Sequence, residues 1–246
     1  MPRTSKLAAL ALALPLALPF VGVGTAWADG TANANLDPIP LNGSGGSGTA
    51  MATVTDGTLE FTLAASGLAE GPHAAHIHFG ADARHECPTA TDDADDDARL
   101  STTEGGPAYG PIVVSLTKTG DTSPASGLAV DRFAAGASFQ YMRGDVAVAP
   151  EIATAIESGQ GVVVVHGVAY EGAKAEVKSD LDPALPASAT DPAICGILSA
   201  APAGGAATGG GGTASGTQDT ALLALGGAAL LAAAGAGTLA VRRVRG

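Results

Sequence analysis

The segment at residues 71–80, Gly-Pro-His-Ala-Ala-His-Ile-His-Phe-Gly, constrains the fold of this chain more than any other stretch. Side chains alternate between the two faces of a β-strand, so His76 and His78 are expected to project from the same face. Ile77 and Phe79 then point the other way, where a hydrophobic core can receive them. Imidazole is the commonest side-chain ligand for metals such as zinc and copper. The segment therefore predicts a strand that supplies half of a metal site.

A third imidazole, His166, closes a run of four valines. In a strand, Val162, Val164 and His166 share one face. A lone histidine in such a place is more often a hydrogen-bonded core residue, but here it has two partners elsewhere in the chain. We therefore expect His76, His78 and His166 to face a common point and to bind one metal ion.

The rest of the middle of the chain has the pattern of short strands separated by turns. The dipeptide Asp56-Gly57 suits a tight hairpin between strands at 49–55 and 58–65. Pro150 begins the one expected helix, which Gly159 ends. Further strands are expected at residues 112–117, 138–143 and 162–168. This pattern predicts an all-β fold, an antiparallel sandwich or barrel with one short helix.

The two ends of the chain read as targeting and anchoring segments. Residues 1–28 combine a basic start, an apolar run and the small-residue cleavage pattern Ala26-Trp27-Ala28, as in a secretory signal peptide. Residues 221–241 contain no charge and are long enough to span a bilayer as a helix, and three arginines follow them. We expect an exported protein on the extracytoplasmic face of the plasma membrane with a single C-terminal anchor. Attachment to the cell wall is the alternative.

The expected organisation therefore has six segments. In chain order they are a signal peptide at 1–28, a flexible N-terminal lead-in at 29–48, a β-domain at 49–200, a Gly/Ala/Thr stalk at 201–220, a transmembrane helix at 221–241 and a basic cytoplasmic tail at 242–246.

The net charge limits the partners that the chain can bind, and the two cysteines predict a disulfide. Residues 29–220 hold all 24 acidic residues and only 7 lysines and arginines, a formal charge of −17. Such a surface repels nucleic acid, which we exclude as a partner. Cys87 and Cys195 are the only cysteines, and in an exported chain the simplest expectation is one disulfide between them.

The motifs resemble those of the Cu/Zn superoxide dismutase superfamily, including its relatives called CHRD domains. Residues 67–78 look like the dismutase pattern G-L-x-x-G-x-H-x-x-H-x-H, in which the last two histidines bind copper. Residues 163–166 are similar to the late strand that carries another copper ligand. The resemblance, over residues 49–199, implies a Greek-key β-sandwich or barrel. It also implies that His73 lies just outside the copper ligands, either orienting one of them or serving a purely structural role.

The same resemblance supports the cysteine pairing. Cys87 stands nine residues past His78, where the dismutases place half of their intrachain disulfide. Residues 194–198, around Cys195, look like the strand with the other half. Residues 110–116 and the expected helix are closer to CHRD domains.

Three departures bear on activity. The position of the bridging histidine in the dismutases is Asp93 here, and no histidine lies between Cys87 and His166, so the sequence disfavours zinc. Pro192 replaces the arginine that guides superoxide in that family. His85 and Asp93 are candidates for an additional copper ligand.

Two functions follow as hypotheses. The first is a membrane-anchored, dismutase-like copper protein whose substrate is superoxide, which would make it an oxidoreductase. The second is a non-catalytic, CHRD-like binding or structural module of the cell envelope, with an envelope component as its partner.

Overall fold

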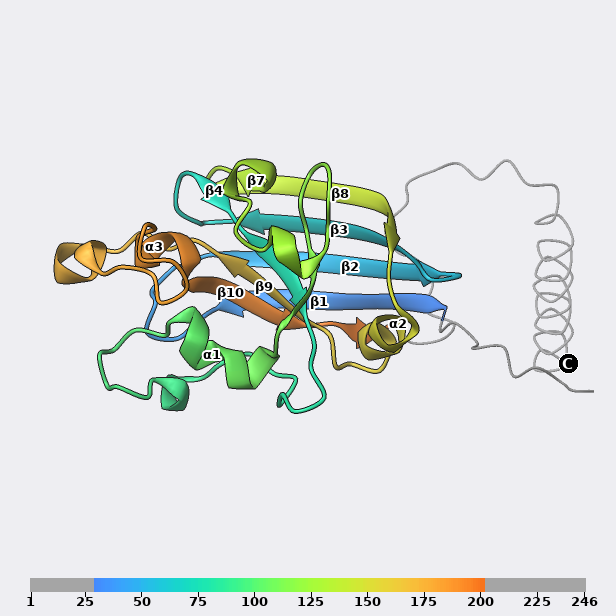
Figure 1. Ribbon diagram of the computed structural model, residues 1–246, viewed down its shortest axis with the longest axis horizontal. Helices are drawn as coiled ribbons and strands as arrows, with labels where there is room; N and C mark the ends of the chain where they lie inside the picture. Colours follow the sequence, from blue (N-terminus) through green and yellow to red (C-terminus); the bar gives the residue numbers. More distant parts are fainter. Residues whose placement is uncertain (1–28, 202–246) are drawn as a thin grey trace, which may run out of the picture. The chain divides into compact units, whose positions relative to one another are not determined.

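The structure is a computed structural model that describes residues 29–201 (Figure 1). Strands dominate this part of the chain, and all of their pairings are antiparallel. The strands are β1 (Gly30–Pro38), β2 (Ser47–Thr55), β3 (Thr58–Ser66), β4 (Pro72–His73), β5 (Ala75–His78), β6 (Ile112–Ser115), β7 (Ala134–Ala135), β8 (Ser138–Ala147), β9 (Val162–His166), β10 (Pro192–Ile197) and β11 (Ser199–Ala200). The helices are α1 (Thr102–Tyr109), α2 (Pro150–Glu157) and α3 (Ala187–Thr190), with short 3₁₀ turns η1 to η4 in the connections.

Strand β1 joins the two layers of the fold. Residues 30–36 pair with β2, whereas Asp37 and Pro38 pair with β10. The main sheet therefore runs continuously in the order β6-β5-β9-β10-β1-β2-β3-β8 and curls over itself. In Figure 1, the layer β8-β3-β2-β1 lies across the strands β5, β9 and β10. The prediction of an antiparallel all-β sandwich is confirmed.

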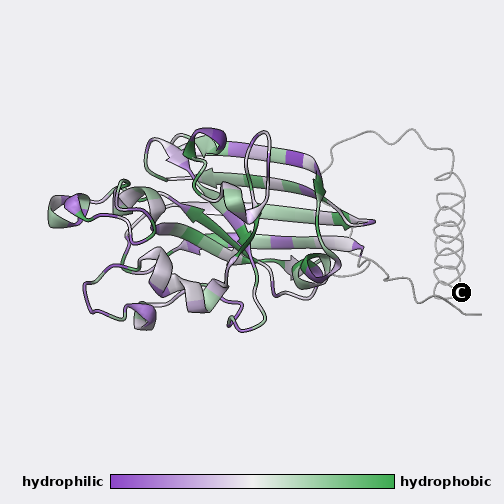
Figure 2. Cartoon of the chain, viewed as in Figure 1, coloured by the Kyte–Doolittle hydropathy of each residue, from purple (hydrophilic) through white to green (hydrophobic). Residues whose placement is uncertain are grey.

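The sandwich core follows from alternation along the strands. In β3, Leu59, Phe61, Leu63 and Ala65 are buried, while Glu60 between them is exposed. Figure 2 shows the corresponding hydrophilic and hydrophobic bands along the strands of this layer. The predicted hairpin between β2 and β3 turns at Asp56-Gly57, where both residues have positive φ, as a type I′ turn requires.

Strand β9 is buried on both of its faces. Val163 and Val165 pack in the sandwich core, whereas Val162 and Val164 belong to a second apolar cluster with Tyr109 of α1. Ile39, Leu100 and the disulfide Cys87–Cys195 complete this second cluster, and the disulfide confirms the predicted cysteine pairing. The outer face of β9 is therefore covered by the segment between β5 and β6 instead of by water.

Two expectations are wrong in this part of the chain. The lead-in predicted as flexible at 29–48 contains β1, whose Ala32, Ala34 and Leu36 are buried in the core. There are also three α-helices in residues 29–201 instead of one. The predicted helix is α2, whereas α1 begins at a capping box in which Ser101 and Glu104 bond each other's backbone N–H groups.

The predicted signal peptide, most of the stalk, the transmembrane helix and the basic tail lie outside the described residues. Within residues 29–201, none of the helices has the length and apolar character needed to cross a membrane.

The place of β1 in the core gives a first prediction. Leu36→Ala should lower the free energy of unfolding by about 2–5 kcal/mol, because Leu36 is 1% exposed and its removal leaves a cavity between the layers. The neighbouring exposed Asn35 serves as the matched control, and Asn35→Ala should change stability by no more than about 0.5 kcal/mol. Urea unfolding measures both. Equal, small effects would mean that residues 30–38 do not belong to the core.

Candidate metal centre

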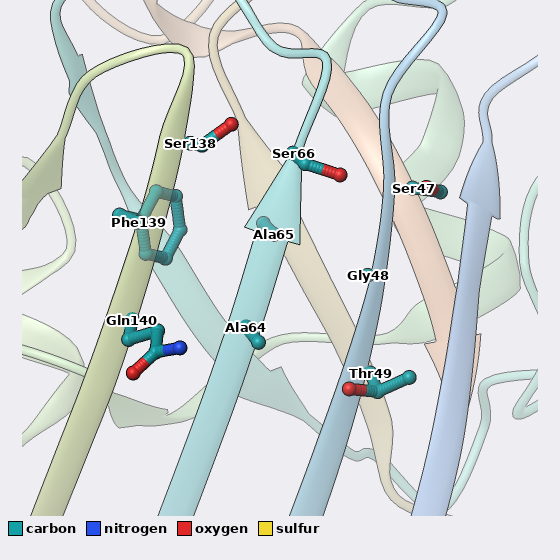
Figure 3. Close-up of a pocket in the computed structure, with 9 residues that line it drawn as sticks. All are labelled: Ser47, Gly48, Thr49, Ala64, Ala65, Ser66, Ser138, Phe139 and Gln140. Atoms are coloured by element: carbon teal, nitrogen blue, oxygen red, sulfur yellow. The ribbon is translucent and has the colours of Figure 1, made fainter.

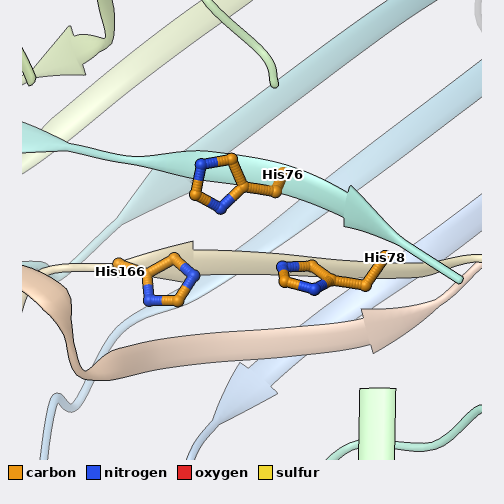
Figure 4. Close-up of side chains that lie close together, drawn as sticks. All are labelled: His76, His78 and His166. Atoms are coloured by element: carbon orange, nitrogen blue, oxygen red, sulfur yellow. The ribbon is translucent and has the colours of Figure 1, made fainter. Parts of the chain in front are cut away.

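Two neighbouring strands bring three histidines together. His76 and His78 lie on β5 and His166 ends β9, and the two strands pair with Ile77 opposite Val163. Ile77 points into the sandwich core, so the alternation of the strand turns His76 and His78 to the outer face, where His166 also projects. Figure 4 shows the three rings around a common space.

The rings are close enough to share one ion. One nitrogen from each ring lies within 4.8 Å of the corresponding nitrogens of the other two. The ring centroid of His76 is 5.1 Å from that of His166 and 5.6 Å from that of His78. All three side chains are buried, with 2–3% of their surface exposed.

Backbone carbonyls set the proton position on each ring. Nε2 of His76 lies 3.0 Å from the carbonyl oxygen of Gly127. Nδ1 of His78 lies 2.8 Å from that of Gly110, and Nδ1 of His166 bonds that of Thr190. A carbonyl oxygen only accepts, so each of these nitrogens must carry the proton. The lone pair of each neutral ring is therefore on its other nitrogen.

Those other nitrogens have no protein partner. Nδ1 of His76, Nε2 of His78 and Nε2 of His166 are all buried without a hydrogen bond. A buried polar atom without a partner costs about 1–3 kcal/mol, so three in one place call for an explanation. A histidine that binds a metal through one ring nitrogen usually donates the N–H of the other to a carbonyl or carboxylate oxygen. All three rings have this arrangement. The donor set fits a metal ion held by three nitrogens.

Burial keeps the three rings neutral. Loss of hydration lowers the pKa of His78 to about 3 and that of His166 to about 4, and the carbonyl hydrogen bonds offset only part of this. The pKa of His76 is also well below its ordinary value, first through burial and then through the neighbouring His166 and His78. Neutral imidazole is the form that binds metals, so the site is ready for an ion at neutral pH.

The low pKa values predict acid sensitivity of the metal-free protein. The unfolded chain takes up protons on these rings near pH 6.5, whereas the folded protein does not, so stability falls as the pH drops below about 6.5. His78 and His166 each contribute a loss on the order of 2 kcal/mol between pH 7.5 and pH 5, and His76 acts in the same direction.

Urea unfolding in a chelator at the two pH values measures this loss. The pKa of Asp191, which burial raises to about 6, acts in the opposite direction, so wild type is compared with His78→Gln. Between pH 7.5 and pH 5, the free energy of unfolding should fall by about 2 kcal/mol less in the variant than in wild type, because the variant lacks the contribution of His78. Identical pH dependence in both proteins would contradict a neutral, buried His78.

A buried ion pair holds Asp191, which directly follows Thr190, the residue whose carbonyl oxygen accepts the hydrogen bond from His166. Asp191 accepts a 2.9 Å bond from the Arg99 guanidinium and another from the Tyr170 hydroxyl. The next residue back, Thr190, offers its carbonyl oxygen both to His166 and to the hydroxyl of Thr102 in α1. The segment that carries α1 is thus tied to the strand end that carries His166.

The other predicted site residues do not join the cluster. His85 bonds the Gly80 carbonyl oxygen and stacks on Phe79, and Asp93 forms a separate group with Asp95 and Glu104, so neither lies in the cluster. The ring of His73 lies between two carbonyl oxygens, one of which belongs to the backbone of His166. His73 therefore contacts the backbone at the end of β9 and not the ring nitrogens of the three clustered histidines.

The acidic group contains Asp93, Asp95 and Glu104. Its carboxylates are already used as acceptors for backbone N–H groups. Asp93 accepts from residues 97 and 98, and Glu104 accepts from Ala94 and Ser101. This group organises the loop before α1.

A recess opens over the three free nitrogens. Its volume is about 390 Å³, and its floor is formed by the three histidines. We call it the histidine recess. Its wall comes from α1, the start of β6, residues 124–130 and the segment before β10. The larger side chains of this wall are Tyr109, Ile112, Leu128, Val130 and Leu181. The Tyr109 ring meets the His78 ring edge-on at 4.5 Å between centroids.

A second hollow lies over the outer surface of β2, β3 and β8 (Figure 3). The nine residues that line it are small or polar apart from Phe139, and none is a histidine, cysteine or acidic residue. The histidine recess is therefore the better candidate for chemistry.

Comparison with known protein families agrees with part of the resemblance. The model of the CHRD domain matches residues 30–174, more than half of the chain. The chain belongs to the CHRD domain family. The match begins at β1 and includes all three clustered histidines of this CHRD domain. No curated protein matches the chain. The relation to the dismutases stays a prediction.

Several residues that shape the centre were missed by sequence reasoning. The three carbonyl acceptors lie at the ends of short helical turns that the pattern does not reveal: Gly110 follows α1, Gly127 follows the 3₁₀ turn at Pro124–Ser126, and Thr190 ends α3. Tyr109 and the Arg99–Asp191 pair were missed because α1 was missed, although the Ser-Thr-Thr-Glu sequence at 101–104 is the signature of a helix start.

Proposed function

We propose that this CHRD domain is a copper-binding module of the cell envelope. Copper is held by Nδ1 of His76, Nε2 of His78 and Nε2 of His166. The proposal rests on one observation, the three buried lone pairs that converge without any protein partner. Membership of the CHRD family favours a binding or structural role over catalysis.

Copper is the metal that best suits this donor set. Imidazole nitrogens bind copper, zinc, iron and nickel, and for a given site the affinity of divalent ions peaks at copper. Cu(I) accepts three nitrogens, and Cu(II) adds a fourth ligand, for which the recess leaves room. No thiolate or carboxylate joins the cluster among residues 29–201. Three histidines with an open fourth position also suit zinc, so the choice of copper rests on the order of affinities.

An extracytoplasmic location belongs to the same proposal. The Cys87–Cys195 disulfide is typical of proteins that fold outside the cytoplasm. The signal-like residues 1–28 and the uncharged stretch at 221–241 support export and anchoring by a C-terminal helix.

Metal analysis of the purified protein tests the ligand set. After exposure to equal concentrations of copper and zinc and then gel filtration, the wild type should retain one copper and little zinc. His166→Gln should retain well below one copper, because two nitrogens remain. His85→Gln is the matched control and should retain one copper, since His85 lies outside the cluster. The proposal fails if wild type retains no copper or if His166→Gln retains as much as wild type.

Superoxide disproportionation is the second candidate, because the recess leaves one side of a bound ion accessible. In that reaction one superoxide is oxidised to O₂ and another is reduced, with two protons, to H₂O₂. The acidic surface and the lack of a basic side chain in the recess wall oppose capture of the anion. We expect the copper-loaded protein to accelerate superoxide decay no more than His166→Gln treated in the same way. A rate far above this control would support the enzyme.

A further inference from the structure

The histidine recess has an apolar wall. Apart from the histidines it is lined by aliphatic side chains, prolines, glycines, two threonines and Tyr109, whose hydroxyl is used in a bond to the Thr102 carbonyl oxygen. Leu128 and Leu181 are 41% and 48% exposed, so two of the few large apolar side chains that face water in residues 29–201 lie at this one recess. Sites for small molecules are typically concave, apolar and about 300–1,000 Å³ in volume, and this recess is within that range.

No charged side chain lines the recess. The basic residues nearby are engaged elsewhere. Arg99 pairs with Asp191, and Arg132 bonds the Ser126 hydroxyl and two carbonyl oxygens of the loop before it. An anion entering the recess therefore loses its hydration and meets no side-chain cation.

We propose that the recess admits one small uncharged molecule with an apolar body to the bound copper and disfavours anions. This inference rests on the proposed function, because it names the class of ligand that reaches the same ion. The charge of the copper attracts the donor atom of either kind of ligand. The apolar wall then decides between them, because it stabilises an apolar body and leaves an anion without compensation for its lost water.

Isocyanides and thiocyanate provide the probes. Both bind Cu(I) through a terminal atom and both carry a C≡N stretch that infrared spectroscopy follows, but only thiocyanate is an anion. The protein is loaded with one Cu(I) under ascorbate, and its copper content is measured before each titration. We expect tert-butyl isocyanide to bind at least tenfold more tightly than methyl isocyanide, because its methyl groups contact the wall. Thiocyanate should bind at least tenfold more weakly than either.

Variants that add a charge test whether the wall of the histidine recess causes the preference for uncharged ligands. Leu181→Lys adds a cation at an exposed position of the wall and should raise the affinity for thiocyanate relative to that for methyl isocyanide severalfold. Met142→Lys is the matched control, since Met142 is 81% exposed and does not line the recess, and it should change neither affinity.

The outcomes separate the two proposals. Stoichiometric copper with equal affinities for the two isocyanides, or with thiocyanate bound as tightly as methyl isocyanide, overturns this inference and leaves the copper module standing. Equal responses to Leu181→Lys and Met142→Lys also overturn it. A protein that retains no copper overturns both.

Discussion

The burial of β9 on both faces is the constraint on which the rest of this structure depends. A strand of four valines and a histidine has no side that favours water, so each face needs its own cover. On one face of β9, Val163 and Val165 pack in the sandwich core. On the other face, the segment that contains α1 covers Val162 and Val164. The histidine cluster belongs to this second layer. It is thus buried without being part of the main core, which is why it can adjoin a recess.

Apart from α1, the cover over the cluster is irregular chain, and specific bonds hold it in place. The disulfide between Cys87 and Cys195 ties its early part to β10, and the Arg99–Asp191 pair ties its later part to the segment before β10. The side-chain amide of Asn42 adds hydrogen bonds to Leu100 and to the Pro192 carbonyl oxygen. These bonds fix the Gly110 and Thr190 carbonyl oxygens, which in turn fix the tautomers of His78 and His166.

The strands and the grouping of the three histidines could be predicted from the sequence, because both follow from the alternation of side chains between the two faces of a strand. The placement of Ile77 in the core and of His76 and His78 on the other face follows directly from that rule. Sequence reasoning failed at β1, where Gly, Ala and Asn residues hide a buried strand, because small side chains carry little hydrophobic signal. It also failed for His85 and Asp93, whose positions depend on the path of an irregular loop that no local pattern encodes.

The pairing of β1 with β10 has a consequence for how the chain acquires its fold. The strand that joins the two layers is the first of the described residues to be synthesised, and β10, its partner across the junction, is near the last. Contacts between such distant segments slow folding, because the long intervening loop must close before they form. During synthesis β1 can form a meander with β2 and β3, but the junction stays incomplete until β10, which ends about 130 residues after β3, has emerged. The carbonyl oxygen of Thr190, which bonds His166, lies just before β10, so the surroundings of the histidine cluster are completed only when nearly all of residues 29–201 have been synthesised.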